Sequence, residues 1–407
     1  MSLKLRSKND WGRLDMTSEW NHSTINDACV LVTDGSHSSP KSVNDGKYMV
    51  SVKDFTDYGF DFASCRMISN DDYETLKRNG CVPQMDDILI GKDGARFFED
   101  IIIYRQKEKP ALLSSIAILR CDKSKILPDF LYYVLRTPSF RQDVKDNYGS
   151  GSAIPRIILK DFKRMMVSYP SLEKQQSIIS VLTAIDSKIQ ANTEINDNLQ
   201  RQASALYGKY FPYAVTDDLP AGWRVGTVGE IVELHDSKRI PLSGAQRAKM
   251  EKRIYPYYGA ASLMDYVDEY IFDGKYLLLG EDGTVMDDAG FPILQYVWGQ
   301  FWVNNHAHIL TGKLGFNVES LLLLFKRTPV KSIVTGAVQP KISQANLRSI
   351  QVVVPPQHEL DAFNELIRPL FEQIRQNQDQ SKALTSLRDA LLPKLMSGEI
   401  DVSDIRL

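Results

Sequence analysis

The stretch Ile178-Ile-Ser-Val-Leu182-Thr-Ala-Ile185-Asp-Ser-Lys-Ile189-Gln-Ala-Asn192 decides the fold of this chain. Its apolar residues follow one another at alternating steps of four and three, which is the spacing of a coiled-coil helix. The same steps continue beyond Asn192, so one long helix is predicted. We call the series of residues at these coiled-coil positions a comb. The first comb reads Ile178, Leu182, Ile185, Ile189, Asn192, Asn196, Leu199, Ala203, Leu206, Tyr210.

A second comb lies 185 positions later, and Asn377 stands in it where Asn192 stands in the first. It reads Phe363, Ile367, Leu370, Ile374, Asn377, Ser381, Leu384, Arg388, Leu391, Leu395. A polar residue in such a comb fixes register at a cost in stability. Asn192→Leu or Asn377→Leu is therefore expected to strengthen helix pairing and loosen its register. Pro369 lies inside the second comb and is expected to kink it.

Two interpretations of the combs stay open. Each helix packs on its own domain, or the two helices pack on each other, and the gapless register favours the second. The predicted helix-pairing residues are Ile178, Leu182, Ile185, Ile189, Asn192, Leu199, Phe363, Ile367, Leu370, Ile374, Asn377, Leu384 and Leu391.

The repeat also includes the segments before the helices. Gly151-Ser-Ala-Ile-Pro155 matches Gly336-Ala-Val-Gln-Pro340, and strand-like runs end at Pro170 and Pro355. Further upstream, Leu89-Ile-Gly-Lys-Asp-Gly resembles Leu278-Leu-Gly-Glu-Asp-Gly, each at the end of an apolar run typical of a strand.

The predicted fold is therefore α+β, with two mixed α/β globular domains alternating with two long helices that pair as an antiparallel coiled coil with pseudo-twofold symmetry. The expected boundaries are 1–150 and 212–335 for the globular domains, and 151–211 and 336–407 for the helical regions.

Composition excludes several classes of protein. The chain has 407 residues and a formal net charge of −2, less basic than a nucleic-acid binder that works alone. Four scattered cysteines suit a reducing compartment. The first ten residues lack the apolar core of a signal peptide, and no apolar run reaches membrane-spanning length. We expect a cytoplasmic protein that does not bind a membrane.

Catalytic signatures are missing from the sequence. It contains no phosphate-binding G-x-x-x-x-G-K-[ST] loop and no G-x-S-x-G nucleophile elbow. His306-x-His308 would place two rings on one face of a strand, but no third metal ligand follows at useful spacing. Two half-buried histidines are the expectation, so we predict a non-enzyme that binds no metal and no cofactor.

Polar and basic loops are the more informative feature, because hydroxyls, amides and guanidinium groups contact phosphates and base edges. A solvated surface loop is the alternative for each of them. The candidate DNA-binding residues are Ser36, His37, Lys41, Lys92, Arg96, Lys238, Arg239, Arg247 and Lys249.

Taken together, these features resemble one family over essentially the whole chain. The order of the halves, the glycine turns, the Pro170 and Pro355 entries and the closing Leu391-Leu-Pro-Lys-Leu-Met396 resemble the specificity (S) subunits of type I restriction-modification systems. The phrase Asp34-Gly-Ser-His-Ser-Ser-Pro40 is similar to that family's target-recognition domains.

The resemblance implies a non-catalytic reader of double-stranded DNA. Each globular domain would read one half of a bipartite site, and the paired helices would set the gap and dock two methyltransferase (M) subunits. S-adenosylmethionine, ATP and magnesium would belong to those subunits and to restriction (R) subunits. A coiled-coil adaptor that does not read DNA, and a nucleic-acid-modifying enzyme with an unrecognised site, stay open as alternatives.

Overall fold

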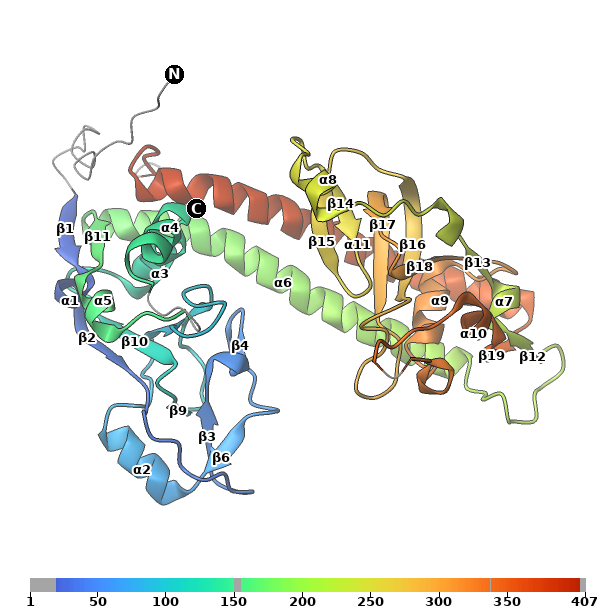
Figure 1. The fold of residues 1–407 in the computed structure, drawn as a ribbon, viewed down its shortest axis with the longest axis horizontal. Coiled ribbons are helices and arrows are strands. Elements are labelled where there is room, and N and C mark those ends of the chain that lie inside the picture. The colour runs from blue at the N-terminus through green and yellow to red at the C-terminus, as the bar shows by residue number, and fades with distance from the viewer. Residues whose placement is uncertain (1–19, 150–154, 337, 403–407) are drawn as a thin grey trace. The chain divides into compact units, whose positions relative to one another are not determined.

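The computed structural model describes residues 20–149, 155–336 and 338–402, and the chain forms two compact units (Figure 1). Unit 1 combines residues up to 190 with residues from 381 onward, and unit 2 comprises residues 191–380. The glycine turn expected at 151–154 and the start of the chain lie outside the described residues.

Two long helices contribute to both units. Helix α6 spans Leu172–Tyr210 and helix α11 spans Gln357–Met396, as the two combs predict. Pro369 lies within α11, which continues in helical conformation past it. The helix ends before Gly398, whose φ of +76° is the left-handed conformation that glycine adopts at helix C-termini.

Unit 1 is built around a four-stranded sheet with the order β2-β10-β7-β8. Those strands are β2 (Cys29–Asp34), β10 (Ile116–Cys121), β7 (Ile88–Gly91) and β8 (Ile101–Ile103). A second sheet contains β6 (Arg66–Ile68), β3 (Lys47–Val50) and β9 (Ala111–Leu112), and two smaller pairs are β1 (Asn21–Thr24) with β11 (Met166–Tyr169) and β4 (Phe55–Thr56) with β5 (Gly59–Phe60). The helices are α1 (Ile25–Ala28), α2 (Asn70–Arg78), α3 (Pro128–Arg136), α4 (Pro138–Asn147), α5 (Leu159–Arg164) and the short η2 (Val52–Asp54).

Unit 2 contains a six-stranded sheet whose first four strands, β13-β18-β16-β17, repeat the central order of unit 1. Its strands are β13 (Val232–Leu234), β18 (Ala307–Gly312), β16 (Phe272–Gly280), β17 (Leu294–Val303), β14 (Tyr255–Tyr258) and β15 (Leu263–Val267). Strand β12 (Arg224–Thr227) pairs with β19 (Gln351–Val354), as β1 pairs with β11 in unit 1. The helices are α7 (Val228–Ile231), α8 (Gly244–Ala248), α9 (Val318–Phe325), α10 (Gln344–Ser349) and the short η3 (Asp236–Lys238) and η4 (Lys331–Ile333).

The core of each unit joins its sheet to its share of the long helices. In unit 1, Ile178 and Leu182 are fully buried with sheet residues and with Leu395 of α11. In unit 2, Phe363 and Ile367 are fully buried together with Leu310 of β18. The apolar side of each comb therefore belongs to the hydrophobic core of a globular unit.

Candidate functional site

In unit 1, the end of strand β7 forms backbone hydrogen bonds with residues 155–157, just before α5. We call this contact the junction. The Ile157 amide donates to the Lys92 carbonyl at 3.0 Å, and the Gly94 amide donates to the Pro155 carbonyl at 2.9 Å. The Lys92 amide donates to the Ser115 carbonyl at 2.9 Å. A φ of +95° at Gly94 makes the turn, which explains the glycine.

The end of strand β16 in unit 2 repeats this junction bond for bond. The Ile342 amide donates to the Glu281 carbonyl at 2.8 Å, and the Gly283 amide donates to the Pro340 carbonyl at 2.9 Å. The Glu281 amide donates to the His306 carbonyl at 2.8 Å. The resemblance between residues 89–94 and 278–283 therefore reflects a structural repeat, with Lys92 and Glu281 in the same place.

In unit 1 the junction holds one buried ion pair. Lys92 Nζ lies 3.2 Å from Asp34 Oδ2, and the two side chains are 9% and 8% exposed. Asp34 is the last residue of β2, next but one to β7 in the sheet. A lysine held this way is directed into the protein, so its ammonium group is not presented to a phosphate.

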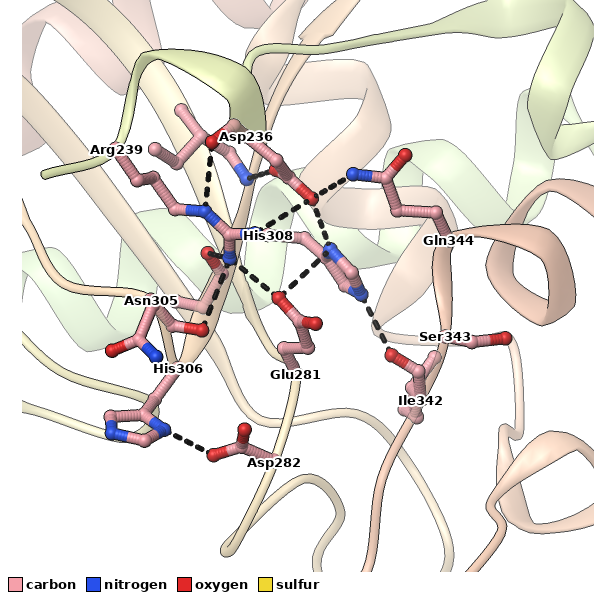
Figure 2. A network of polar contacts seen from close by, with 12 residues as sticks. Asp236, Arg239, Glu281, Asp282, Asn305, His306, His308, Ile342, Ser343 and Gln344 are labelled. Atoms are coloured by element: carbon pink, nitrogen blue, oxygen red, sulfur yellow. Dashed lines mark hydrogen bonds and ion pairs between the residues drawn. The ribbon is translucent and has the colours of Figure 1, made fainter. Parts of the chain in front are cut away.

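In unit 2 the junction holds a larger network, shown in Figure 2. His308 is fully buried; its Nδ1 lies 2.6 Å from Asp236 Oδ2 and its Nε2 lies 2.8 Å from the Ile342 carbonyl oxygen. Both ring nitrogens of His308 therefore lie within hydrogen-bond distance of an oxygen atom. Asp236 also accepts from the Ile309 amide at 2.9 Å and from Gln344 Nε2 at 2.6 Å.

Glu281 forms ion pairs with two basic side chains of the network, Arg239 and Lys341. Its Oε2 lies 2.5 Å from Arg239 Nη1, and its Oε1 lies 3.2 Å from Lys341 Nζ. Burial opposes the ionised form, but these partners and His308 hold the pKa of Glu281 below its ordinary value. Asp236 has a lowered pKa for the same reason, since His308, the Ile309 amide and Arg239 outweigh its burial. The Glu281 carboxylate therefore neutralises cationic side chains of the protein itself, the mostly buried Arg239 and the more exposed Lys341.

Asp236, Glu281 and His308 form one group of three potential metal ligands within the described part of the chain, with ligand atoms within 4.8 Å of one another. Their hydrogen-bond partners do not fit a metal ion. Both His308 nitrogens already have oxygen partners within the protein, and Arg239 and Lys341 already pair with Glu281. A divalent cation would add charge beside these positive groups, so we assign the cluster a structural role.

The predicted DNA-binding residues divide into two groups. Ser36, Lys92, Arg239 and Arg247 are buried or partly buried and bound within the protein: Ser36 to Ser38, Lys92 to Asp34, Arg239 to Glu281, and Arg247 to Asp265 at 3.0 Å. The other five side chains are exposed, namely His37, Lys41, Arg96, Lys238 and Lys249. Arg96 pairs with Asp100 at 2.7 Å, and His37 lies 3.4 Å from Asp34.

The predicted helix-pairing residues are buried or half-buried throughout. Ile178, Leu182, Asn192, Phe363, Ile367, Ile374 and Asn377 are buried, and Ile185, Ile189, Leu199, Leu370, Leu384 and Leu391 are half-buried. In unit 1, Arg388 of α11 lies 2.9 Å from Asp186 of α6.

Asparagines connect α6 and α11 within unit 2. Asn192 Nδ2 donates to the Asn377 carbonyl at 3.2 Å, and Asn377 Nδ2 donates to Asn196 Oδ1 at 2.9 Å. Asn196 Nδ2 in turn donates to the Ile374 carbonyl at 3.2 Å. All three asparagine side chains are at most 5% exposed, so polar contacts replace apolar packing here.

Sequence reasoning missed Asp236 and Glu281 as partners of His308. They lie 72 and 27 positions away in the chain, and only the sheet order brings them together. The expectation of two half-buried histidines is wrong for His308, which is fully buried. His306 is 44% exposed and contacts Asp282. No helix among the described residues is long and apolar enough to cross a membrane.

Comparison with known proteins places this arrangement in a family. The specificity subunit of the type I restriction enzyme MjaIX of Methanocaldococcus jannaschii is 26% identical over 315 residues, covering 70% of this chain and 71% of that protein. A putative type I restriction enzyme MjaX specificity subunit of the same organism is 19% identical over 416 residues, covering 95% of each chain.

A solved structure shares the fold. The crystal structure of a type I restriction-modification S subunit from M. genitalium matches with a TM-score of 0.54 and 18% identity, covering 94% of this chain and 97% of that one. The model of the protein family described as "Type I restriction modification DNA specificity domain" matches residues 17–201 and 220–385. Those two ranges contain both duplicated junctions and most of both long helices, so the chain belongs to the family of type I restriction-modification DNA specificity proteins.

Proposed function

We propose that this chain is the non-catalytic specificity subunit of a type I restriction-modification complex, and that each unit reads one half of a bipartite site in double-stranded DNA. The observation that carries the proposal is the duplicated junction, with its matched backbone hydrogen bonds at Lys92 and Glu281. Two similar folds with different side chains suit two half-sites of different sequence.

The long helices act as the spacer between the two readers, packed antiparallel as a coiled coil. The contacts within unit 2 support this direction. Residue 192 of α6 reaches Gln380 of α11, residue 196 reaches Ile374, and Tyr207 contacts Phe363, so α11 numbers fall as α6 numbers rise. The buried asparagines then define one register for the pair.

Methylation and cleavage belong to partner subunits in this proposal. Two methyltransferase subunits bring S-adenosylmethionine, and restriction subunits bring ATP and magnesium. The specificity subunit itself binds no cofactor. Its near-neutral charge is consistent with partners that supply part of the phosphate contacts.

Exposed cations are the first candidates for DNA contact from this chain. Lys41 in unit 1 and Lys238 and Lys249 in unit 2 are exposed, and the structure gives none of these three an ion pair in the described ranges. Lys92 and Arg239 instead form ion pairs inside the protein, with Asp34 and Glu281, at the ends of strands β7 and β16. Alanine at an exposed lysine should weaken binding to all sequences alike and reduce its salt dependence.

Methylome sequencing of cells with and without the gene tests the proposal. We expect one bipartite methylated motif to disappear on deletion and to return with the complete gene. A chain in which residues 212–335 come from another family member should change only one half of the motif. An unchanged methylome after deletion would refute the assignment.

A further inference from the structure

A cavity of about 370 Å³ lies in unit 1 where the β4–β5 hairpin, α3 and the long helices meet. Arg136, the last residue of α3, lines it together with Thr385 of α11. The Arg136 guanidinium lies 4.9 Å from the centre of the Tyr132 ring and also donates to the Tyr132 hydroxyl. Across residues 20–149, 155–336 and 338–402, Arg136 forms no ion pair with a carboxylate.

A second cavity of about 370 Å³ lies in unit 2, and Lys326 lines it together with Gln200 and Ser204 of α6. Lys326 follows directly after α9, and its Nζ donates to Gln200 Oε1 at 2.9 Å. The described structure gives Lys326 no carboxylate partner either. Lys326 is exposed as a residue, and partial burial of its ammonium group lowers the pKa of Lys326.

The two cavities occupy equivalent places. Helices α3 and α9 follow the equivalent strands β10 and β18, and Arg136 and Lys326 each stand five residues after the leucines at 131 and 321. On the helix side, Thr385 and Gln200 are 185 residues apart, which is the register of the repeat. The chain therefore presents the same feature twice among its described residues: a cation that forms no ion pair, at the border between a globular fold and the long helices.

An anionic group is the ligand that these cations need, and the surroundings favour a single carboxylate over a nucleic-acid backbone. Asp57, Glu99, Asp100 and Asp186 line the first cavity together with Arg96 and Arg388, and Asp197 and Arg201 line the second. Arg96 pairs with Asp100 and Arg388 pairs with Asp186, so Arg136 is the arginine of the first cavity that forms no ion pair in the described residues. A continuous row of phosphates would meet the like charges of these carboxylates. One acidic side chain that enters the cavity can pair with the cation alone, at the strength of a charge-assisted hydrogen bond.

We propose that Arg136 and Lys326 are twin docking points, each receiving an aspartate or glutamate side chain from one copy of a protein partner that binds this chain twice. The inference rests on the proposed function, in which two methyltransferase subunits join each specificity subunit. It adds where each copy is held and by which charge.

Charge reversal tests the inference by counting subunits. The full chain, Arg136→Glu, Lys326→Glu and the double variant would each be mixed with the cognate methyltransferase subunit and weighed by native mass spectrometry. Arg78→Glu and Lys313→Glu are matched controls, because both residues are exposed cations, one in each unit, with no ion pair in the described structure.

We expect two partner copies on the unaltered chain and on both controls, one copy on each single variant, and none on the double variant. Each single reversal should weaken binding of one copy by at least about tenfold. Thr385→Trp, which fills the first cavity and keeps Arg136, should also remove one copy, and circular dichroism should show all variants folded.

Two bound copies on every variant, with unchanged affinity, would overturn the inference. So would two copies combined with weaker DNA binding, because Arg136 and Lys326 would then be phosphate contacts. An unaltered chain that binds no methyltransferase subunit would instead refute the proposed function, on which the inference rests.

Discussion

The asparagine contacts in unit 2 yield a prediction with a defined sign. Asn377→Leu removes the donor to Asn196 Oδ1 and the acceptor of Gln373 Nε2, which lie at 2.9 and 2.7 Å. The repeat alone suggested that leucine would strengthen the helix pair. The structure reverses that expectation, because Asn196 would keep a buried oxygen without its donor.

The magnitude follows from opposing contributions. A buried polar atom left without a partner costs about 1–3 kcal/mol. Full burial of a leucine contributes about 1.5–3 kcal/mol, and the polar neighbours of this site hold the gain at or below the lower end of that range. We expect Asn377→Leu to destabilise this segment by about 1 kcal/mol. Replacing Asn196 and Asn377 together by leucine removes both polar groups, so the double variant should be at least as stable as the original chain.

Hydrogen exchange measured by mass spectrometry on peptides covering residues 370–380 gives the local free energy of opening. The original chain, the two single leucine variants and the double variant form a double-mutant cycle. We expect a coupling energy of at least about 1 kcal/mol between positions 196 and 377. Additive effects within about 0.3 kcal/mol would refute the reasoning, because they would mean that these side chains do not depend on each other.

Three further outcomes are expected. Asp236→Ala should destabilise unit 2 by about 3–5 kcal/mol in urea unfolding, because it leaves His308 buried without its carboxylate; a loss under 1 kcal/mol would contradict the network. Glu281 has a lowered pKa in the folded chain, so its stabilising contribution is present above its unfolded pKa of about 4.3 and is lost as pH falls below that value; Glu281→Gln should flatten the acid limb of a stability profile. Insertion of seven residues into both long helices should lengthen the gap between half-sites in the methylome, and a change in the bases read would count against the spacer.

The elements with a strong period were predictable from sequence. Both long helices lie where their patterns indicate, and so do the strands that end at Gly91 and Gly280 and those that precede Pro170 and Pro355. The repeat also predicted that Lys92 and Glu281 occupy equivalent places, which the junction hydrogen bonds confirm. These features depend on local spacing, so they can be read along the chain.

The surroundings of charged side chains were not predictable in the same way. Lys92 looks like a DNA contact in its loop, but Asp34, 58 positions earlier, lies opposite it and keeps it inside. Arg239 is likewise held by Glu281, 42 positions later. A buried ion pair depends on which strands become neighbours, and the chain order does not state that. Exposure therefore had to come from the structure.

The placement of these counter-charges bears on how such genes can recombine. The partner of Lys92 is Asp34, within the first globular segment, and Glu281 finds Arg239 and His308 within the second. A crossover at the borders of residues 1–150 or 212–335 would keep Lys92 with Asp34, and Glu281 with Arg239 and His308. The ion pair between Glu281 and Lys341 would cross the border after residue 335. A crossover between positions 34 and 92 would separate Lys92 from Asp34 and leave the lysine buried without that counter-charge, which costs stability. Inheritance of residues 1–150 as one segment avoids this loss.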